Sequence, residues 1–169
     1  MTQRKCMNTY RWLTGAVGAL LLLSLQNAAA QGGTDFHTVT VQVSTITAVQ
    51  VSSGTVNMNI AGASTVAGQD QMSIVDQSTS LLWGINSSLK KITVNTSLVA
   101  PKYTMKVLAV SPSVGTASSE VTLSTTAADF MVNVGRSSGS CTLKYTGIAL
   151  ASQGTGSDAH TITFTVITQ

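Results

Sequence analysis

Apolar and polar residues alternate along two stretches of this chain with a period of two. The apolar positions are Tyr103, Met105, Val107 and Ala109 in the first stretch and Ile162, Phe164 and Val166 in the second. They alternate with Lys102, Thr104 and Lys106 in the first stretch and with Thr161, Thr163 and Thr165 in the second. Successive side chains of a β-strand point to opposite faces, so this alternation predicts two strands with one buried and one solvated face.

Shorter runs of the same kind predict further strands at residues 55–60, 72–75, 80–83, 91–94, 121–123, 130–132 and 141–145. Turn-forming residues gather between them at 62–68, 111–119, 135–139 and 153–157. No stretch of the chain after residue 30 sustains the 3.6-residue period of a helix. The pattern therefore predicts an all-β protein, a β-sandwich of the jelly-roll or immunoglobulin-like kind with about nine or ten short strands.

Residues 36–51 form the longest apolar and hydroxyl-rich stretch, and its alternation slips once. Val39, Val41 and Val43 share one parity and Ile46 falls on the other, which predicts two strand segments that meet near Ser44 and Thr45. Sixteen extended residues would span roughly 50 Å, whereas a globule of this size is roughly 37 Å across. The stretch must bend, cross between sheets or project. If it projects, Val39, Val41, Val43 and Ile46 form a candidate assembly strand.

The first thirty residues have the pattern of a cleaved signal peptide. Basic residues come first, an apolar run of about a dozen residues follows, and Ala28 and Ala30 suit a signal peptidase. A retained anchor is the alternative, but the run is shorter than the roughly 20 residues that span a bilayer. We expect a signal peptide at 1–30 and a single β-sandwich domain at 31–169. The protein would be secreted or displayed at the cell surface, after periplasmic passage in a Gram-negative host, without a membrane-spanning helix in the mature chain.

Removal of the signal peptide changes the charge. The whole chain has nine basic and six acidic residues, a net charge of +3. Three of the nine basic residues (Arg4, Lys5 and Arg11) lie in the first thirty positions, so six basic and six acidic residues remain. A chain with zero net charge lacks the basic surface that nucleic-acid binding needs. It also opposes self-association less than a charged chain does.

The chain after residue 30 carries few groups that suit catalysis or metal binding. Its two histidines, His37 and His160, would approach each other if the first and last strands paired, which raises the possibility of a metal site. No third ligand is close in sequence, and we interpret Asp35 and Asp158 as ordinary loop acids. The carboxylates are scattered singly, and the glycine-rich stretch 154–158 precedes a strand rather than a helix, so it predicts a turn and not a phosphate site. We expect no enzymatic activity, no metal and no cofactor.

Three other side chains raise alternatives. Cys141 is the single cysteine after residue 30; it shares a face with Leu143 and Tyr145, which favours a buried, inert thiol over a disulfide between chains. Trp83 and Tyr103 are the candidate aromatics for binding carbohydrate. Trp83 lies in the apolar run 81–85, so a place in the core is the competing interpretation.

Segments 121–127, 138–146 and 154–166, with Lys90–Val94, resemble a group of uncharacterised short bacterial secreted proteins. The alternating strands near the two ends also resemble, more distantly, pilin-like and spore-coat-U-like subunits. The first resemblance implies a secreted β domain. The second implies subunits that join by lending a strand to the next copy.

The sequence therefore favours a secreted structural or adhesive surface protein that self-assembles through its N-terminal strand. The expected partner is another copy or another surface protein. A secreted carbohydrate-binding module is the alternative.

Overall fold

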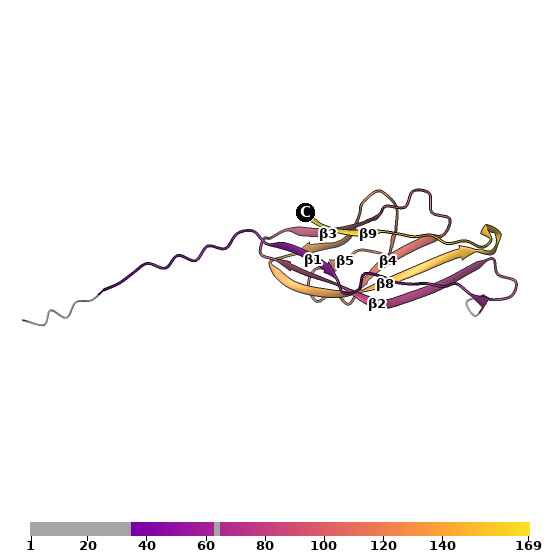
Figure 1. Cartoon of the computed structure of the whole chain (residues 1–169), viewed down its shortest axis with the longest axis horizontal. Helices are drawn as coiled ribbons and strands as arrows, with labels where there is room; N and C mark the ends of the chain where they lie inside the picture. Colours follow the sequence, from indigo (N-terminus) through magenta and orange to yellow (C-terminus); the bar gives the residue numbers. More distant parts are fainter. Residues whose placement is uncertain (1–34, 63–64) are drawn as a thin grey trace, which may run out of the picture. The chain divides into compact units, whose positions relative to one another are not determined.

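The computed structural model describes residues 35–62 and 65–169. The contacts within the chain divide it into two units, Met1–Gln42 and Val43–Gln169. The second unit contains all the strands that follow (Figure 1). The predicted signal peptide, residues 1–30, lies outside the described residues.

The predicted all-β fold is confirmed, with nine strands in the described part of the chain. They are β1 (Thr47–Val51), β2 (Gln71–Ile85), β3 (Lys90–Thr96), β4 (Thr104–Val110), β5 (Thr116–Ala117), β6 (Val121–Thr122), β7 (Ala128–Val134), β8 (Ser137–Leu150) and β9 (Ile162–Thr168). A single turn of 3-10 helix, η2 (Ala151–Gln153), follows β8.

The strands form two antiparallel sheets that pack face to face as a β-sandwich. The larger sheet has the order β1-β2-β8-β4-β6 and the smaller has the order β5-β7-β3-β9. Alternate side chains of each strand enter the space between the sheets, as the burial of Val107 and Ala109 in β4 illustrates. Phe130 in β7 and Phe164 in β9 meet there edge to face, with ring centroids 5.1 Å apart. Burial of this apolar surface is the main force that holds the sheets together.

β2 is a single long strand where the sequence predicted two short ones. It pairs with β8 from Gln71 to Ile85, with an irregularity between Asp76 and Thr79. At this point the Asp76 carboxylate accepts hydrogen bonds from the backbone N–H and the hydroxyl of Ser78. The local turn bends the strand without ending its pairing, as a bulge does.

Asn86, which lies just after β2, forms hydrogen bonds that hold the chain before β1 against the sandwich. The Asn86 side chain accepts from the Ile46 N–H at 2.7 Å and donates to the Ser44 carbonyl at 2.7 Å, while its own N–H donates to Ile46. The break predicted near Ser44 and Thr45 therefore coincides with this attachment. Only Thr47–Val51 of the stretch 36–51 is a strand, because only these residues find a partner, in β2.

Residues 55–60 do not form the predicted strand, although their alternation survives. Val56, Met58 and Ile60 are half-buried while Thr55, Asn57 and Asn59 are exposed. The end of the Met58 side chain lies against Gly147 of β8, 3.5 Å from where a Cβ on that glycine would be. The segment thus covers the inner side of the larger sheet with its side chains and joins no backbone ladder.

Gly139 of β8 lies closely against the indole ring of Trp83 in β2, the residue opposite it in the ladder. A Cβ on Gly139 would lie 2.5, 2.6 and 2.8 Å from Cζ2, Cε2 and Nε1 of that ring. Real Cβ atoms do not approach other atoms so closely, so any residue other than glycine at this position would force the indole ring to shift.

Replacing Gly139 by alanine should lower the free energy of unfolding by about 1–3 kcal/mol, because Trp83 must move to admit the methyl group. Urea titration followed by the fluorescence of Trp83 would measure this. Gly84→Ala is the matched control, since nothing lies within 4 Å of a Cβ there; its effect should stay within about 0.5 kcal/mol. Equal effects of the two variants would contradict the tight contact.

Candidate functional site

Among the edge strands of the two sheets in the described residues, β9 is the longest. This strand pairs with β3 on one side, and within the described residues no strand pairs with its other side. Two backbone hydrogen bonds show which residues of β9 bond to β3: Ser97 N–H donates to the Thr161 carbonyl, and Gln169 N–H donates to the Leu89 carbonyl. Hydrogen-bonded pairs alternate in an antiparallel ladder, so the N–H and C=O groups of Ile162, Phe164 and Val166 face the open edge.

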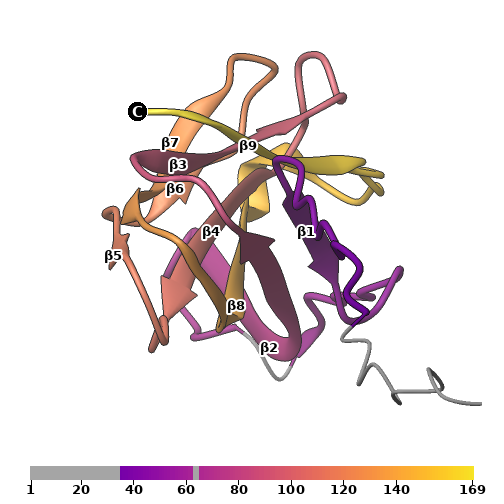
Figure 2. The ribbon, with the colours of Figure 1, turned by 90° about the vertical axis from the view of Figure 1, so that its left-hand side faces the viewer.

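An apolar groove borders this open edge. β1, at the edge of the larger sheet, lies next to β9, at the edge of the smaller one (Figure 2). Between them is a groove of about 200 Å³ with Val49, Leu81 and Phe164 among its lining residues. Leu81 lines the groove and is itself 0% exposed, so the floor of the groove is part of the hydrophobic core.

The opposite edges of the two sheets are much shorter. β5 and β6 have two residues each, against five in β1 and seven in β9. Short edge strands offer few unpaired backbone groups to another chain. The two long open edges, β1 and β9, border the same groove.

The four residues of the candidate assembly strand are all exposed. The exposed fractions are 73% for Val39, 84% for Val41, 71% for Val43 and 51% for Ile46. The first two belong to the first unit, whereas Val43 and Ile46 belong to the second. The Ile46 N–H donates to the Asn86 side chain and its carbonyl accepts from the Asn86 N–H. Residues 36–43 therefore remain as the stretch without a strand partner among the described residues.

The two candidate ligand aromatics lie in different surroundings. Trp83 is 4% exposed and packs on Gly139, so its ring offers no face to a ligand. Tyr103 is half-buried; its hydroxyl donates to the Gly154 carbonyl at 2.8 Å, and Lys102 Nζ lies 5.6 Å from its ring centroid. A single ring that is already engaged by a cation gives little support to a sugar-binding platform.

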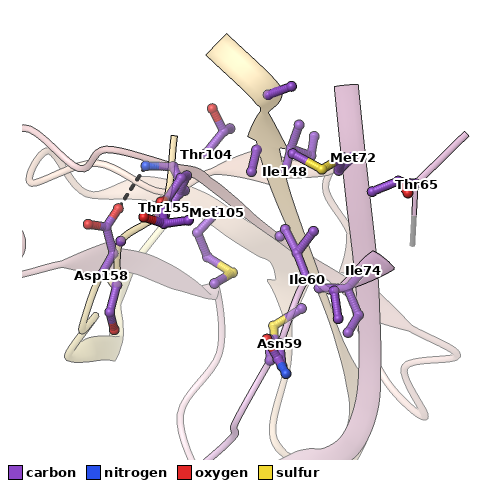
Figure 3. Close-up of a pocket in the computed structure, with 18 of the residues that line it drawn as sticks. Asn59, Ile60, Thr65, Met72, Ile74, Thr104, Met105, Ile148, Thr155 and Asp158 are labelled. Atoms are coloured by element: carbon purple, nitrogen blue, oxygen red, sulfur yellow. Dashed lines mark hydrogen bonds between the residues drawn. The ribbon is translucent and has the colours of Figure 1, made fainter. Parts of the chain in front are cut away.

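Tyr103 lines a larger cavity of about 790 Å³ that sequence reasoning did not anticipate. The cavity lies between the segment 55–60, the inner side of β2, β4 and β8, and the loop 154–160 (Figure 3). Its apolar side includes Met58, Ile60, Met72, Ile74 and Met105. The alternating apolar residues of 55–60 were the available sequence signal, but they predicted a strand and not a cavity wall.

Hydrogen bonds hold the polar side of this cavity in place. Asp158 Oδ2 accepts from the Tyr103 N–H at 2.7 Å, and Lys102 Nζ donates to the Thr155 carbonyl at 2.7 Å. Asp158 and Thr155 lie on one side of the cavity, away from Ile60 and Ile74 (Figure 3). The loop 154–160 is therefore a preformed wall.

His160 is the histidine of this wall. Its Nδ1 lies 3.2 Å from Oγ1 of Thr96, which is fully buried. Burial lowers the pKa of His160, against a smaller opposing effect of the Asp158 charge. The lowered pKa favours the neutral form of the imidazole. Within residues 35–62 and 65–169, no three His, Cys, Asp or Glu side chains are placed to hold a metal ion. β1 pairs with β2 and not with β9, so the strands expected to bring His37 and His160 together are not partners.

Cys141 is buried, as its shared face with Leu143 and Tyr145 predicted. Burial raises the pKa of its thiol to about 11, and a hydrogen bond with the Leu81 backbone opposes this only in part. The thiol is therefore protonated at pH 8. Because the thiolate is the reactive form, we expect the folded chain from Gln31, in which Cys141 is the single cysteine, not to react with Ellman's reagent at pH 8. After guanidinium unfolding it should react with one equivalent. Rapid reaction of native protein would contradict the buried position.

The comparisons with known proteins add no relative: no family model, no curated protein and no solved structure matches the chain. In the part of the chain that the structure covers, there is no helix with the length and apolar character to cross a membrane.

Proposed function

We propose that this protein is an exported structural or adhesive surface subunit, and that copies join when residues 36–43 of one copy add to the open edge of β9 in the next. The observation that carries the proposal is the seven-residue open edge of β9 beside an apolar groove, in a chain that also exposes an alternating run of valines.

The side chains of the two parts are complementary. In an extended strand, Val39, Val41 and Val43 point to one side and Thr38, Thr40 and Gln42 to the other. The valine side would enter the groove next to Phe164, and the polar side would face solvent. The backbone of the added strand would bond to the unpaired groups of Ile162, Phe164 and Val166, which is how strand addition gains affinity.

Charge and composition also support the proposal. The chain from Gln31 carries zero net charge, so copies do not repel one another over long range. Of its 139 residues, 42 are serine or threonine. Their hydroxyl groups make the outer faces of the strands hydrophilic without adding charge. Threonine also suits strands because its branched Cβ fits a pleated surface.

The test is the size of the purified chain from Gln31, measured by light scattering and electron microscopy as concentration rises. We expect filaments or an open-ended size distribution. Deleting Gln31–Gln42 should leave a folded monomer, because Val43–Gln169 is a compact unit that keeps the Asn86 attachment. A truncated chain that assembles as well as the parent would overturn strand donation.

Two double variants provide a matched control at constant length. Val39→Asp with Val41→Asp places two charges on the side that would enter the groove, and should abolish assembly. Thr38→Asp with Thr40→Asp places the same charges on the solvent side, and should permit it. A monodisperse monomer of the parent at every concentration would instead favour a binding module, and a glycan screen with Tyr103→Ala as the comparison would follow.

A further inference from the structure

The cavity beside Tyr103 has the features of a small-molecule site. Ligand pockets are concave, have volumes of roughly 300–1,000 Å³, and combine an apolar lining with a few fixed polar groups. This cavity has a volume of about 790 Å³, and its lining includes three methionines and three isoleucines together with residues of the loop 154–160. It lies apart from the groove beside Val49 and Phe164 and shares no lining residue with it.

The apolar side of the cavity can adapt to an occupant. Met58, Met72 and Met105 come from three different parts of the chain, and the methionine side chain is flexible and polarisable. Met58 and Ile60 also lie in the segment 55–60, which forms no strand. Ile60 and Ile74 both line the cavity and lie on the side away from Asp158 (Figure 3). A flexible aliphatic body would therefore fit between the segment 55–60 and the inner side of β2.

The polar side of the cavity carries a single full charge. Asp158 is the only acidic residue in the lining, and no lysine or arginine belongs to it. Its Oδ2 is engaged by the Tyr103 N–H, and its Oδ1 has no hydrogen-bond partner among the described residues. Lys102 is not among the lining residues, and its ammonium group is held by the Thr155 carbonyl. Burial lowers the pKa of His160, which favours its neutral form.

From this arrangement, we propose that the cavity binds a small aliphatic molecule that ends in an amine, with its chain against the methionines and its ammonium group at Asp158 Oδ1. Carboxylates and ammonium groups attract, and the attraction strengthens where apolar surroundings lower the effective dielectric constant. An anionic amphiphile of the same length would meet the Asp158 charge instead. The site does not depend on the assembly of copies.

Calorimetric titration of the chain from Gln31 with octylamine and with octanoate at pH 7 tests this, since the two probes share a chain and differ in charge. We expect octylamine to bind about tenfold more tightly than octanoate, the ratio that one partly screened charge pair supplies. Failure of octylamine to bind, or equal binding of the two probes, would overturn the proposal.

Two variants locate the site. Asp158→Asn keeps an oxygen that can accept from Tyr103 N–H but removes the charge, so the preference for octylamine should fall to about threefold or less. Ile60→Trp should fill the cavity and abolish binding of both probes. Asn57→Trp is its control, because Asn57 is exposed and does not line the cavity. Circular dichroism confirms that each variant is folded, and undiminished binding to folded Ile60→Trp would place the site elsewhere.

Discussion

Replacing Phe130 by alanine should lower the free energy of unfolding by about 3–5 kcal/mol, the usual loss when a buried phenyl group leaves a cavity. Phe130 is 1% exposed in β7, and its ring packs edge to face on Phe164 at an interplanar angle of 62°. The two strands flank β3, so this contact ties together the inner side of the smaller sheet. An aromatic pair of this kind adds about 0.5–1.5 kcal/mol to the burial of the ring.

Urea unfolding followed by circular dichroism would measure the loss, and the melting temperature should fall by about 10 °C or more. Phe36→Ala makes the same chemical change at a side chain that is 88% exposed, and should alter stability by no more than about 0.5 kcal/mol. A loss under about 1 kcal/mol at Phe130 would contradict its place in a closely packed core.

Replacing Val166 by proline should abolish assembly and leave the sandwich folded. The N–H of Val166 faces the open edge of β9, by the alternation set at Ser97 and Gln169. Proline is tolerated on an edge strand where its missing N–H faces away from the ladder. The substitution therefore removes a donor that an added strand would need, without removing a β3–β9 bond.

Thr165→Pro is the matched comparison, one residue away. Its N–H belongs to the β3–β9 ladder, opposite Thr93, so proline there should destabilise the fold by about 1–3 kcal/mol or more. Light scattering gives the assembly state and urea unfolding the stability. A Val166→Pro protein that still forms filaments would exclude β9 as the accepting edge.

The inner and outer faces of the strands could be predicted wherever alternation and pairing coincide. In β9 the alternation of Phe164 with its threonine neighbours was sufficient to predict which side chains are buried. In β8 the shared face of Cys141 and Leu143 was sufficient in the same way. For Trp83, the apolar run 81–85 indicated the core as the alternative to a ligand-binding surface, and the side chain is buried. Gly139, which packs against Trp83, lies in a stretch that was predicted to be a turn. A glycine there indicates a turn unless it is known that the indole ring of Trp83, distant in sequence, occupies the space of a side chain.

Pairing itself could not be predicted from local pattern. Residues 55–60 alternate as well as any strand, but they lie over the inner side of β2 and β8 where no edge is free for them. β5 was missed because two residues become a strand only through their partner β7. The cavity was missed for a related reason: its lining comes from segments that are distant in sequence.

The unequal edges of the two sheets have a consequence for how growth would stop. In the proposed assembly each subunit has one head and one tail, and the two-residue strands β5 and β6 provide no branch point. Filaments would thus be linear and their two ends chemically different. A copy that lacks residues 31–42 would terminate one end, and a Val166→Pro copy would terminate the other. Small amounts of either would set the mean filament length, as a chain stopper does in a condensation polymer, and a mixture of the two alone would stop at dimers.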